Sequence, residues 1–302
     1  MKKLIVELSN ERLITPSGLA LVGGALGKSD LVKRANRTKV DSKRSQPQIK
    51  NGDILLSYIG LLCQGKTCYE AVQEFHEDPA YYKYALGIAY AIPSVETLRQ
   101  RMDLIGSSMR DDILQANVTM FHTLDIHPTP LENEKVPLDL DVTPFDNSKT
   151  RKEGVSRTYK GFDGYAPMMA YLGAEGYMVN TDDTVIELYH AHGESEQYHS
   201  EIKTDMDVER LPSGKFDTNE LVLELTVLAY NILRIIGQNS LKSKRAPKTK
   251  RPVKRRRIRT VISNLILIAG HVTEHARRVV LSLGCSNIWR HIFLDLYQLL
   301  VA

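Results

Sequence analysis

Sulfur and long apolar runs are scarce in this chain of 302 residues. It has three cysteines, Cys63, Cys68 and Cys285, and no two of them form a CxxC pair. An odd number at such spacing excludes a disulfide framework and a structural zinc finger, and it fits a reducing compartment. No apolar run reaches the roughly 18 residues of a membrane span, and polar residues follow the start too soon for a secretory signal. We therefore expect a cytoplasmic protein with no membrane partner.

Acidic residues are missing from one stretch. Residues 242–259 hold eleven Lys or Arg and no Asp or Glu, so the other 284 residues sum to −7 in a chain of net charge +4. Such a run can be a solvated linker. It can also neutralise DNA phosphates, in which case binding weakens with added salt. The candidate DNA contacts in this run are Arg251, Lys254, Arg255, Arg256 and Arg257.

Helical patterns dominate the first 110 residues. Apolar periodicity predicts a helix over residues 53–62 that Gly65 ends. Thr67 and Glu70 have capping-box spacing and predict a second helix, and Ser94 is the expected cap of a third. These helices fit either a helix-turn-helix-like DNA-binding module or a plain helical bundle. The arginines expected on the third helix are Arg99 and Arg101.

Two short motifs indicate other chemistry, and their context argues against both. Residues 60–67 satisfy the phosphate-loop pattern GxxxxGKT, but the pattern should follow a buried strand and here it overlaps a predicted helix. We therefore expect no nucleotide. Residues 271–275 satisfy the zinc-hydrolase pattern HxxEH, but a third ligand is missing and Arg277 and Arg278 would oppose a cation.

A strand carrying two carboxylates is expected over residues 136–144. Its leucines and valine alternate with Asp139 and Asp141, so the two carboxylates share one face about 6.5 Å apart. Aspartate is a poor strand former, which indicates that the charge is used. An edge strand with an acidic outer face is the alternative. Downstream, Gly173 and Gly176 predict a hairpin.

A concentration of ionisable residues follows in a helix expected from Thr184. At 100° per residue, five of them fall on one face about 80° wide. This arrangement fits a catalytic face, and a solvated charged helix face is the alternative. The five residues are Tyr189, His192, Glu196, His199 and Lys203.

These two blocks resemble bacterial insertion-sequence transposases of the DDE type. The spacing Tyr189-x2-His192-x3-Glu196-x6-Lys203 is similar to their Y-x2-R-x3-E-x6-K signature, with His in place of Arg. The strand LDLDVTPFDNSKT is similar to their first catalytic block and assigns Asp141. The amino-acid sequence around both blocks resembles that of the insertion sequence thirteen-eighty group.

The resemblance implies an RNase H-like core in an α+β or α/β chain, acting in DNA transposition. Asp141 and Glu196 would be catalytic ligands of Mg²⁺ or Mn²⁺. Tyr189, His192 and Lys203 would contact DNA. The partners would be the transposon's terminal inverted repeats, the target DNA and a second copy in a homodimer, associated with the bacterial nucleoid.

One part of the family pattern is missing. Only 55 positions separate Asp141 from Glu196, and no segment between them reads as the strand that carries the family's middle Asp. An internal deletion would explain this and would impair catalysis. A catalytically inactive DNA-binding remnant that occupies transposon ends is the alternative. A deletion would also leave the apolar helix at 218–237 uncovered.

Four regions are expected. A helical DNA-binding region covers residues 1–125, and a truncated RNase H-like core covers 126–240. A basic linker follows over 241–260, and a C-terminal helical region ends the chain over 261–302.

Overall fold

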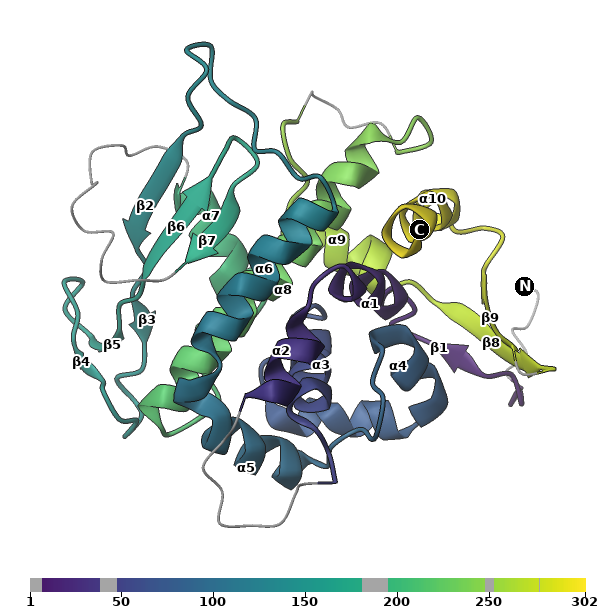
Figure 1. Ribbon diagram of the computed structural model, residues 1–302, viewed down its shortest axis with the longest axis horizontal. Coiled ribbons are helices and arrows are strands. Elements are labelled where there is room, and N and C mark those ends of the chain that lie inside the picture. Colours follow the sequence, from purple (N-terminus) through teal and green to yellow (C-terminus); the bar gives the residue numbers. More distant parts are fainter. Residues whose placement is uncertain (1–6, 39–47, 181–194, 248–252, 277) are drawn as a thin grey trace, which may run out of the picture.

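Helices build the N-terminal part of the chain in a computed structural model that describes residues 7–38, 48–180, 195–247, 253–276 and 278–302. They pack around the long helix α8, which crosses the middle of the molecule (Figure 1). The helical segments up to residue 123 are α1 (Leu19–Gly27), α2 (Leu31–Arg37), α3 (Asn51–Leu62), η1 (Tyr69–His76), α4 (Pro79–Leu86), α5 (Val95–Ile105), η2 (Gly106–Ser108) and α6 (Arg110–Thr123).

Helix α8 (Phe216–Lys242) is the centre of the core. Its 27 residues span about 40 Å. A helix that is apolar on all sides is stable only when it is covered on all sides. Helices α1, α3, α5 and α6 cover α8 together with strand β7. The expectation that this helix would be left uncovered is therefore wrong.

A three-stranded antiparallel sheet lies beside α8. It consists of β2 (Leu138–Val142), β6 (Met168–Leu172) and β7 (Tyr177–Asn180), in the order β2-β6-β7. The predicted strand and hairpin are both confirmed. Gly173 and Gly176 have φ of 75° and 69°, which a side chain tolerates poorly. A Cβ on Gly176 would also lie 2.3 Å from the ring of Tyr198, so this glycine lets the next helix approach the hairpin.

Two smaller sheets complete the strands of the described residues. One is formed by β3 (Phe145–Asp146), β5 (Asp163–Tyr165) and β4 (Ser156–Arg157), and the other by β1 (Leu13–Ile14), β8 (Gly270–His275) and β9 (Arg278–Leu283). The remaining helical segments are α7 (Ser195–Ser200), the π-helical turns η4 (Glu201–Asp205) and η5 (Ile262–Ile266), α9 (Ile258–Val261) and α10 (Arg290–Val301). The mixture of helices and small antiparallel sheets agrees with the expected α+β class.

Several local predictions can be compared directly with the fold. Helix α3 agrees with the helix expected over 53–62, and the backbone N–H of Thr97 donates to the capping hydroxyl of Ser94 at 3.2 Å. The capping box at Thr67 is wrong. Thr67 is buried, and its hydroxyl donates to the carbonyl of Asp207 at 3.3 Å, so residues 69–76 form a 3-10 segment without a side-chain cap.

The C-terminal region is not all helical as expected. Strands β8 and β9 form an antiparallel hairpin over residues 270–283. Apolar residues at 279, 281 and 283 alternate with the more exposed positions, which is the period of a strand. The helix start expected at Thr184 lies outside the described residues.

Candidate active site on strand β2 and helix α7

The acidic strand and the helix of ionisable residues lie against each other. Helix α7 packs on β2, and the Asp141 carboxylate Oδ2 lies 3.4 Å from Nδ1 of His199. Both side chains are largely shielded, with exposed fractions of 24% and 11%. Strand β2 is the outer strand of its sheet in the described residues.

The position of Glu196 follows from the helix. Its backbone belongs to α7, and its side chain lies outside the described residues. Residues three apart share a helix face, so position 196 lies on the face through which His199 contacts Asp141. Tyr189 and His192 lie outside the described residues as well.

Burial controls the charge of His199. It lowers the pKa of this imidazole to about 4, although Asp141 acts in the opposite direction, and the nearby Lys203 and Lys160 lower it further. The ring is therefore neutral near pH 7. Its Nε2 is buried and has no hydrogen-bond partner among the described residues.

The side chain of Lys203 lies at the end of strand β2. Its ammonium donates to the carbonyl of Pro144, lies 3.8 Å from Glu209 and sits 5.5 Å from the centre of the Phe145 ring. Burial lowers the pKa of Lys203, against the effect of Glu209, and Lys160 lowers it further. The segment that carries Glu196 and Lys203 thus lies against the end of β2 that carries Asp141, although Asp141 is more than 50 residues earlier in the sequence.

A buried charge cluster supports this end of the helix, and sequence reasoning missed it. The carboxylate of Glu201 is 2.5 Å from Nη2 of Arg234 and 2.8 Å from Nη1 of Arg255, and it accepts from the Tyr230 hydroxyl at 3.1 Å. Arg234 is fully buried. Burial by itself would lower the pKa of Arg234, but Tyr230 and Glu201 outweigh it and raise the pKa. Glu201 begins the turn η4, so the cluster anchors the segment between Glu196 and Lys203.

The basic run is partly folded into the protein. The guanidinium of Arg255 lies 4.3 Å from the centre of the Tyr198 ring, and that of Arg256 lies 4.9 Å from the centre of the Trp289 ring. Arg257 is held by Asp205, with Nε donating to Oδ2 at 2.8 Å. Arg251 lies outside the described residues.

Lys254 lines a shallow pocket with residues 129–133, and its backbone carbonyl accepts from Gln238. Arg99 and Arg101 of α5 also have partners. Arg99 contacts Glu96 at 2.6 Å, and Arg101 donates to the carbonyl of Ile49 at 3.0 Å. The DNA contacts expected for these residues stay predictions.

The residues at this site can be compared with the ligands that a divalent metal ion requires. Asp141 offers a partly exposed carboxylate, the ligand type that Mg²⁺ prefers. Among the described residues, no three His, Cys, Asp or Glu side chains gather closely enough to hold an ion. Asp141 therefore fits such an ion as one ligand.

Neither short motif forms the site that its pattern suggests. Gly60 lies inside α3 and Lys66 pairs with Glu74, so the GxxxxGKT segment is no phosphate loop. Residues 271–275 form strand β8, where side chains three apart point to opposite faces. Glu274 therefore faces away from His271 and His275.

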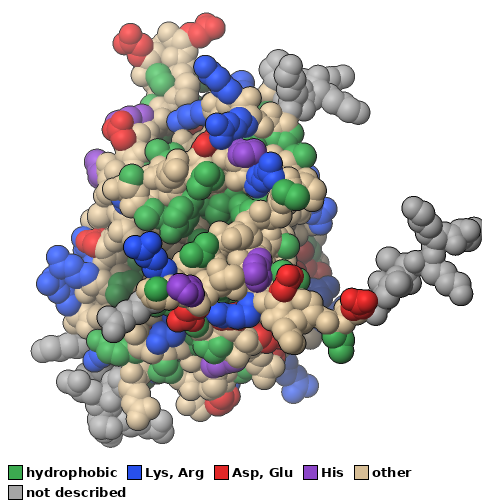
Figure 2. Space-filling model, turned by 90° about the vertical axis from the view of Figure 1, so that its right-hand side faces the viewer, with side chains coloured by type: hydrophobic (Ala, Val, Ile, Leu, Met, Phe, Trp, Pro, Cys, Tyr) green, Lys and Arg blue, Asp and Glu red, His purple; other side chains and the backbone are tan. Residues whose placement is uncertain are grey.

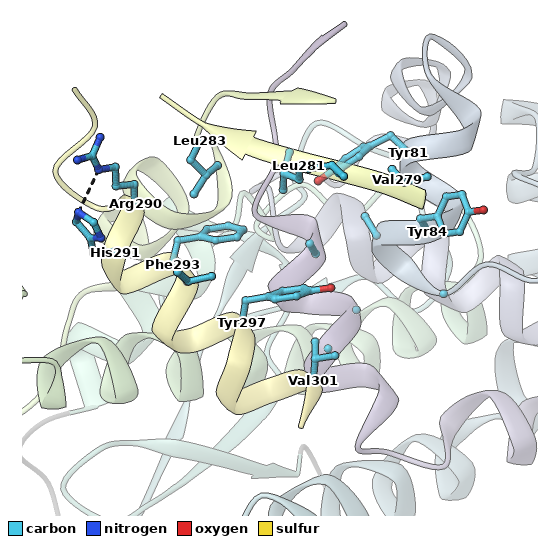
Figure 3. A pocket seen from close by; sticks show the side chains of 17 residues that line it. Tyr81, Tyr84, Val279, Leu281, Leu283, Arg290, His291, Phe293, Tyr297 and Val301 are labelled. Carbon is cyan, nitrogen blue, oxygen red and sulfur yellow. Dashed lines mark hydrogen bonds between the residues drawn. The ribbon is translucent and has the colours of Figure 1, made fainter. Parts of the chain in front are cut away.

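A large hollow in the described residues lies elsewhere. Hydrophobic side chains gather in it on the face that carries α10, with basic and histidine side chains at its margins (Figure 2). It has a volume of about 800 Å³ between α1, α4, β9 and α10. Arg290 donates to Nε2 of His291 at 3.2 Å at one end of it (Figure 3). Its lining contains no carboxylate, so it lacks the ligands for metal-dependent phosphoryl transfer.

Comparison with known families gives one match. Residues 178–302 match the family model described as Transposase DDE domain group 1. This match includes α7 with Glu196 and the buried cluster around Glu201, and it supports a DDE transposase. Asp141 lies outside the matched range. Comparison with curated proteins and with solved structures gives no match. No helix in the described part of the chain is long and apolar enough to cross a membrane.

Proposed function

We propose that this chain is a DDE transposase of a bacterial insertion sequence and that it cleaves and joins DNA strands during transposition. The carrying observation is the 3.4 Å contact between Asp141 on β2 and His199 on α7, one helical turn from Glu196. This contact joins the two segments whose sequences resemble the catalytic blocks of that family. The insertion sequence thirteen-eighty group is the proposed subgroup.

Strand cleavage requires that negative charge on the attacking and leaving oxygens be stabilised. Bound Mg²⁺ or Mn²⁺ would supply that stabilisation. In this proposal Asp141 and Glu196 hold the ion through carboxylate oxygens. Lys203 places a positive charge at the end of β2, where a scissile phosphate would lie. In this proposal Tyr189 and His192 contact the DNA strand that contains this phosphate.

The proposed activity is weak. No segment between Asp141 and Glu196 reads in the sequence as the strand that carries the family's middle Asp, which the proposal attributes to an internal deletion. Positioned charge supplies most of the rate in phosphoryl transfer, so loss of one ligand should slow cleavage by several orders of magnitude.

A second candidate function is a catalytically inactive remnant that binds transposon ends. One observation favours it. The described arginines of the basic run have partners, as Arg257 has Asp205, which gives them fixed positions for contacts to DNA phosphates. In both candidates the protein acts in the bacterial cytoplasm at the nucleoid, as a homodimer on terminal inverted repeats and target DNA.

A cleavage assay distinguishes the two. The purified full chain would be incubated with labelled DNA that carries its terminal inverted repeat, with Mg²⁺, with Mn²⁺ or with a chelator. We expect slow metal-dependent nicking that Asp141→Asn and Glu196→Gln abolish. Asp146→Asn is the matched control, because this exposed carboxylate lies on β3, four residues after the end of β2. Binding without any nicking would favour the remnant, and rapid strand transfer would contradict the impairment.

A further inference from the structure

A polar pocket lies on the side of α7 next to position 196. It has a volume of about 460 Å³ and is lined by side chains from two segments, α7 with the turn η4 and the end of the basic run. The lining residues are Gln197, Ser200, Glu201, Arg255 and Arg257. The lining residues include no residue of strand β2, which carries Asp141.

Positive charge exceeds negative charge around this pocket. Glu201 lies between Arg234 and Arg255. Asp205 is shared in the same way by two further arginines, Arg257 at 2.8 Å and Arg259 at 3.8 Å. Four guanidinium groups thus share two carboxylates, which leaves this group with a net charge of about +2.

The carboxylate of Glu201 does not oppose an anion in the pocket. Its side chain is 2% exposed, and its second oxygen accepts from the backbone N–H of Ile258 at 3.1 Å. The carboxylate also accepts hydrogen bonds from Arg234, Arg255 and Tyr230, so its negative charge is compensated inside the protein. The side chain of Arg257 is 51% exposed and that of Arg255 is 12% exposed, so Arg257 is the guanidinium more open to an anion.

The two arginines are held in place before any ligand arrives. Nη2 of Arg255 donates to Oε1 of Gln197 at 2.9 Å, and its guanidinium rests on the Tyr198 ring. Nη2 of Arg257 donates to Oγ of Ser200 at 3.3 Å. Groups fixed in this way lose little side-chain entropy when they bind an anion. Arginine is also the side chain best suited to phosphate oxygens, because its donors form a planar fork.

We propose that this pocket binds a phosphate group of a nucleic-acid backbone. The identification of the nucleic acid rests on the proposed function, and the phosphate chemistry rests on the charges. Gln197 and Ser200 lie three residues apart on one face of α7, and position 196 is adjacent to Gln197. Successive residues point about 100° apart on a helix, so the pocket lies on a different side of α7 from the face of residues 196 and 199.

Binding of DNA in the absence of divalent ions tests the pocket. The full chain would be titrated into a fluorescein-labelled single-stranded oligonucleotide with EDTA present, at several KCl concentrations. Arg257→Gln is the informative variant, since Asp205 keeps Arg259 and its backbone N–H at 3.1 Å. Arg245→Gln is the matched control. Arg245 belongs to the same basic run, is 60% exposed and pairs with Asp295 away from the pocket.

We expect Arg257→Gln to weaken binding about tenfold, as for loss of a charge-assisted hydrogen bond. It should also reduce the slope of log affinity against log salt by about 0.7, the value for one phosphate of a single strand. Arg245→Gln should leave the slope unchanged. Arg257→Lys keeps the charge without the fork, so it should retain the slope with reduced affinity.

Two results would overturn the pocket. Equal losses for Arg257→Gln and Arg245→Gln would mean that the whole run acts as a diffuse basic tail. Tight binding of inorganic phosphate in calorimetry, with oligonucleotide affinity independent of Arg257, would mean a site for free phosphate. Because EDTA removes the metal, the outcome is separate from that of the cleavage proposal.

Discussion

The ion pair between Glu201 and Arg234 gives the sharpest test of how the site is supported. Replacing Glu201 by Gln removes the charge and keeps the shape. Arg234 is 0% exposed, so its guanidinium cannot turn to water when it loses its partner. Breaking a buried pair in this way costs about 3–5 kcal/mol. We expect about 3 kcal/mol, since the Gln amide oxygen still accepts a hydrogen bond.

The assay is urea denaturation of the full chain, followed by circular dichroism. Glu201→Gln should shift the midpoint to lower urea with an unchanged slope. A double variant, Glu201→Gln with Arg234→Gln, should lose less than the sum of the two single variants, because it leaves no unpaired guanidinium at position 234. Glu96→Gln is the control. It breaks the exposed pair with Arg99 and should have no measurable effect.

One outcome would refute this reasoning. If Glu201→Gln loses less than about 1 kcal/mol, the cluster behaves like an exposed pair and does not anchor the segment between Glu196 and Lys203.

Two further predictions concern the packing of α7 and the N-terminal region. Gly176→Ala should lower the free energy of unfolding by about 2–4 kcal/mol, from the positive φ and the clash with Tyr198, and Gly214→Ala, which has open space, should change it little; urea denaturation measures both. For Asp78, burial raises the pKa, but the hydrogen bonds and charge of Arg12 and the backbone N–H of Tyr81 together outweigh it and hold the pKa below its usual value. Its stabilisation is therefore present above about pH 4 and is lost as the pH falls through the lowered pKa. Asp78→Asn should flatten the acid side of the curve of melting temperature against pH, and a curve unchanged by the substitution would contradict this.

Local signals in the sequence predicted local structure well. The cap at Ser94 and the glycine hairpin at 173–176 depend on hydrogen bonds and dihedral angles within a few residues. The acidic strand was predicted for the same reason, because alternation has a period that neighbouring residues fix. Thr67 fails because a distant segment, at Asp207, offers its hydroxyl a better partner.

The supporting structure of the site depends on contacts between distant residues. Glu201 and Arg234 are 33 positions apart, and nothing in the spacing of either helix indicates the pair. The run 242–259 has the composition of a solvated linker, yet Arg256 is buried with its Nε on Ser240. The partners of the arginines in this run come from distant segments, so composition alone predicts that these side chains are solvated.

The central claim is that Asp141 and Glu196 together hold a divalent ion against DNA. Binding of Mn²⁺ to the full chain, followed by electron paramagnetic resonance, tests it most directly. Asp141→Asn and Glu196→Gln should each weaken binding at least about tenfold, and the double variant should lose little more, because both carboxylates serve one site. If each single variant binds Mn²⁺ as tightly as the unmodified chain, the two residues do not share an ion and the account is contradicted.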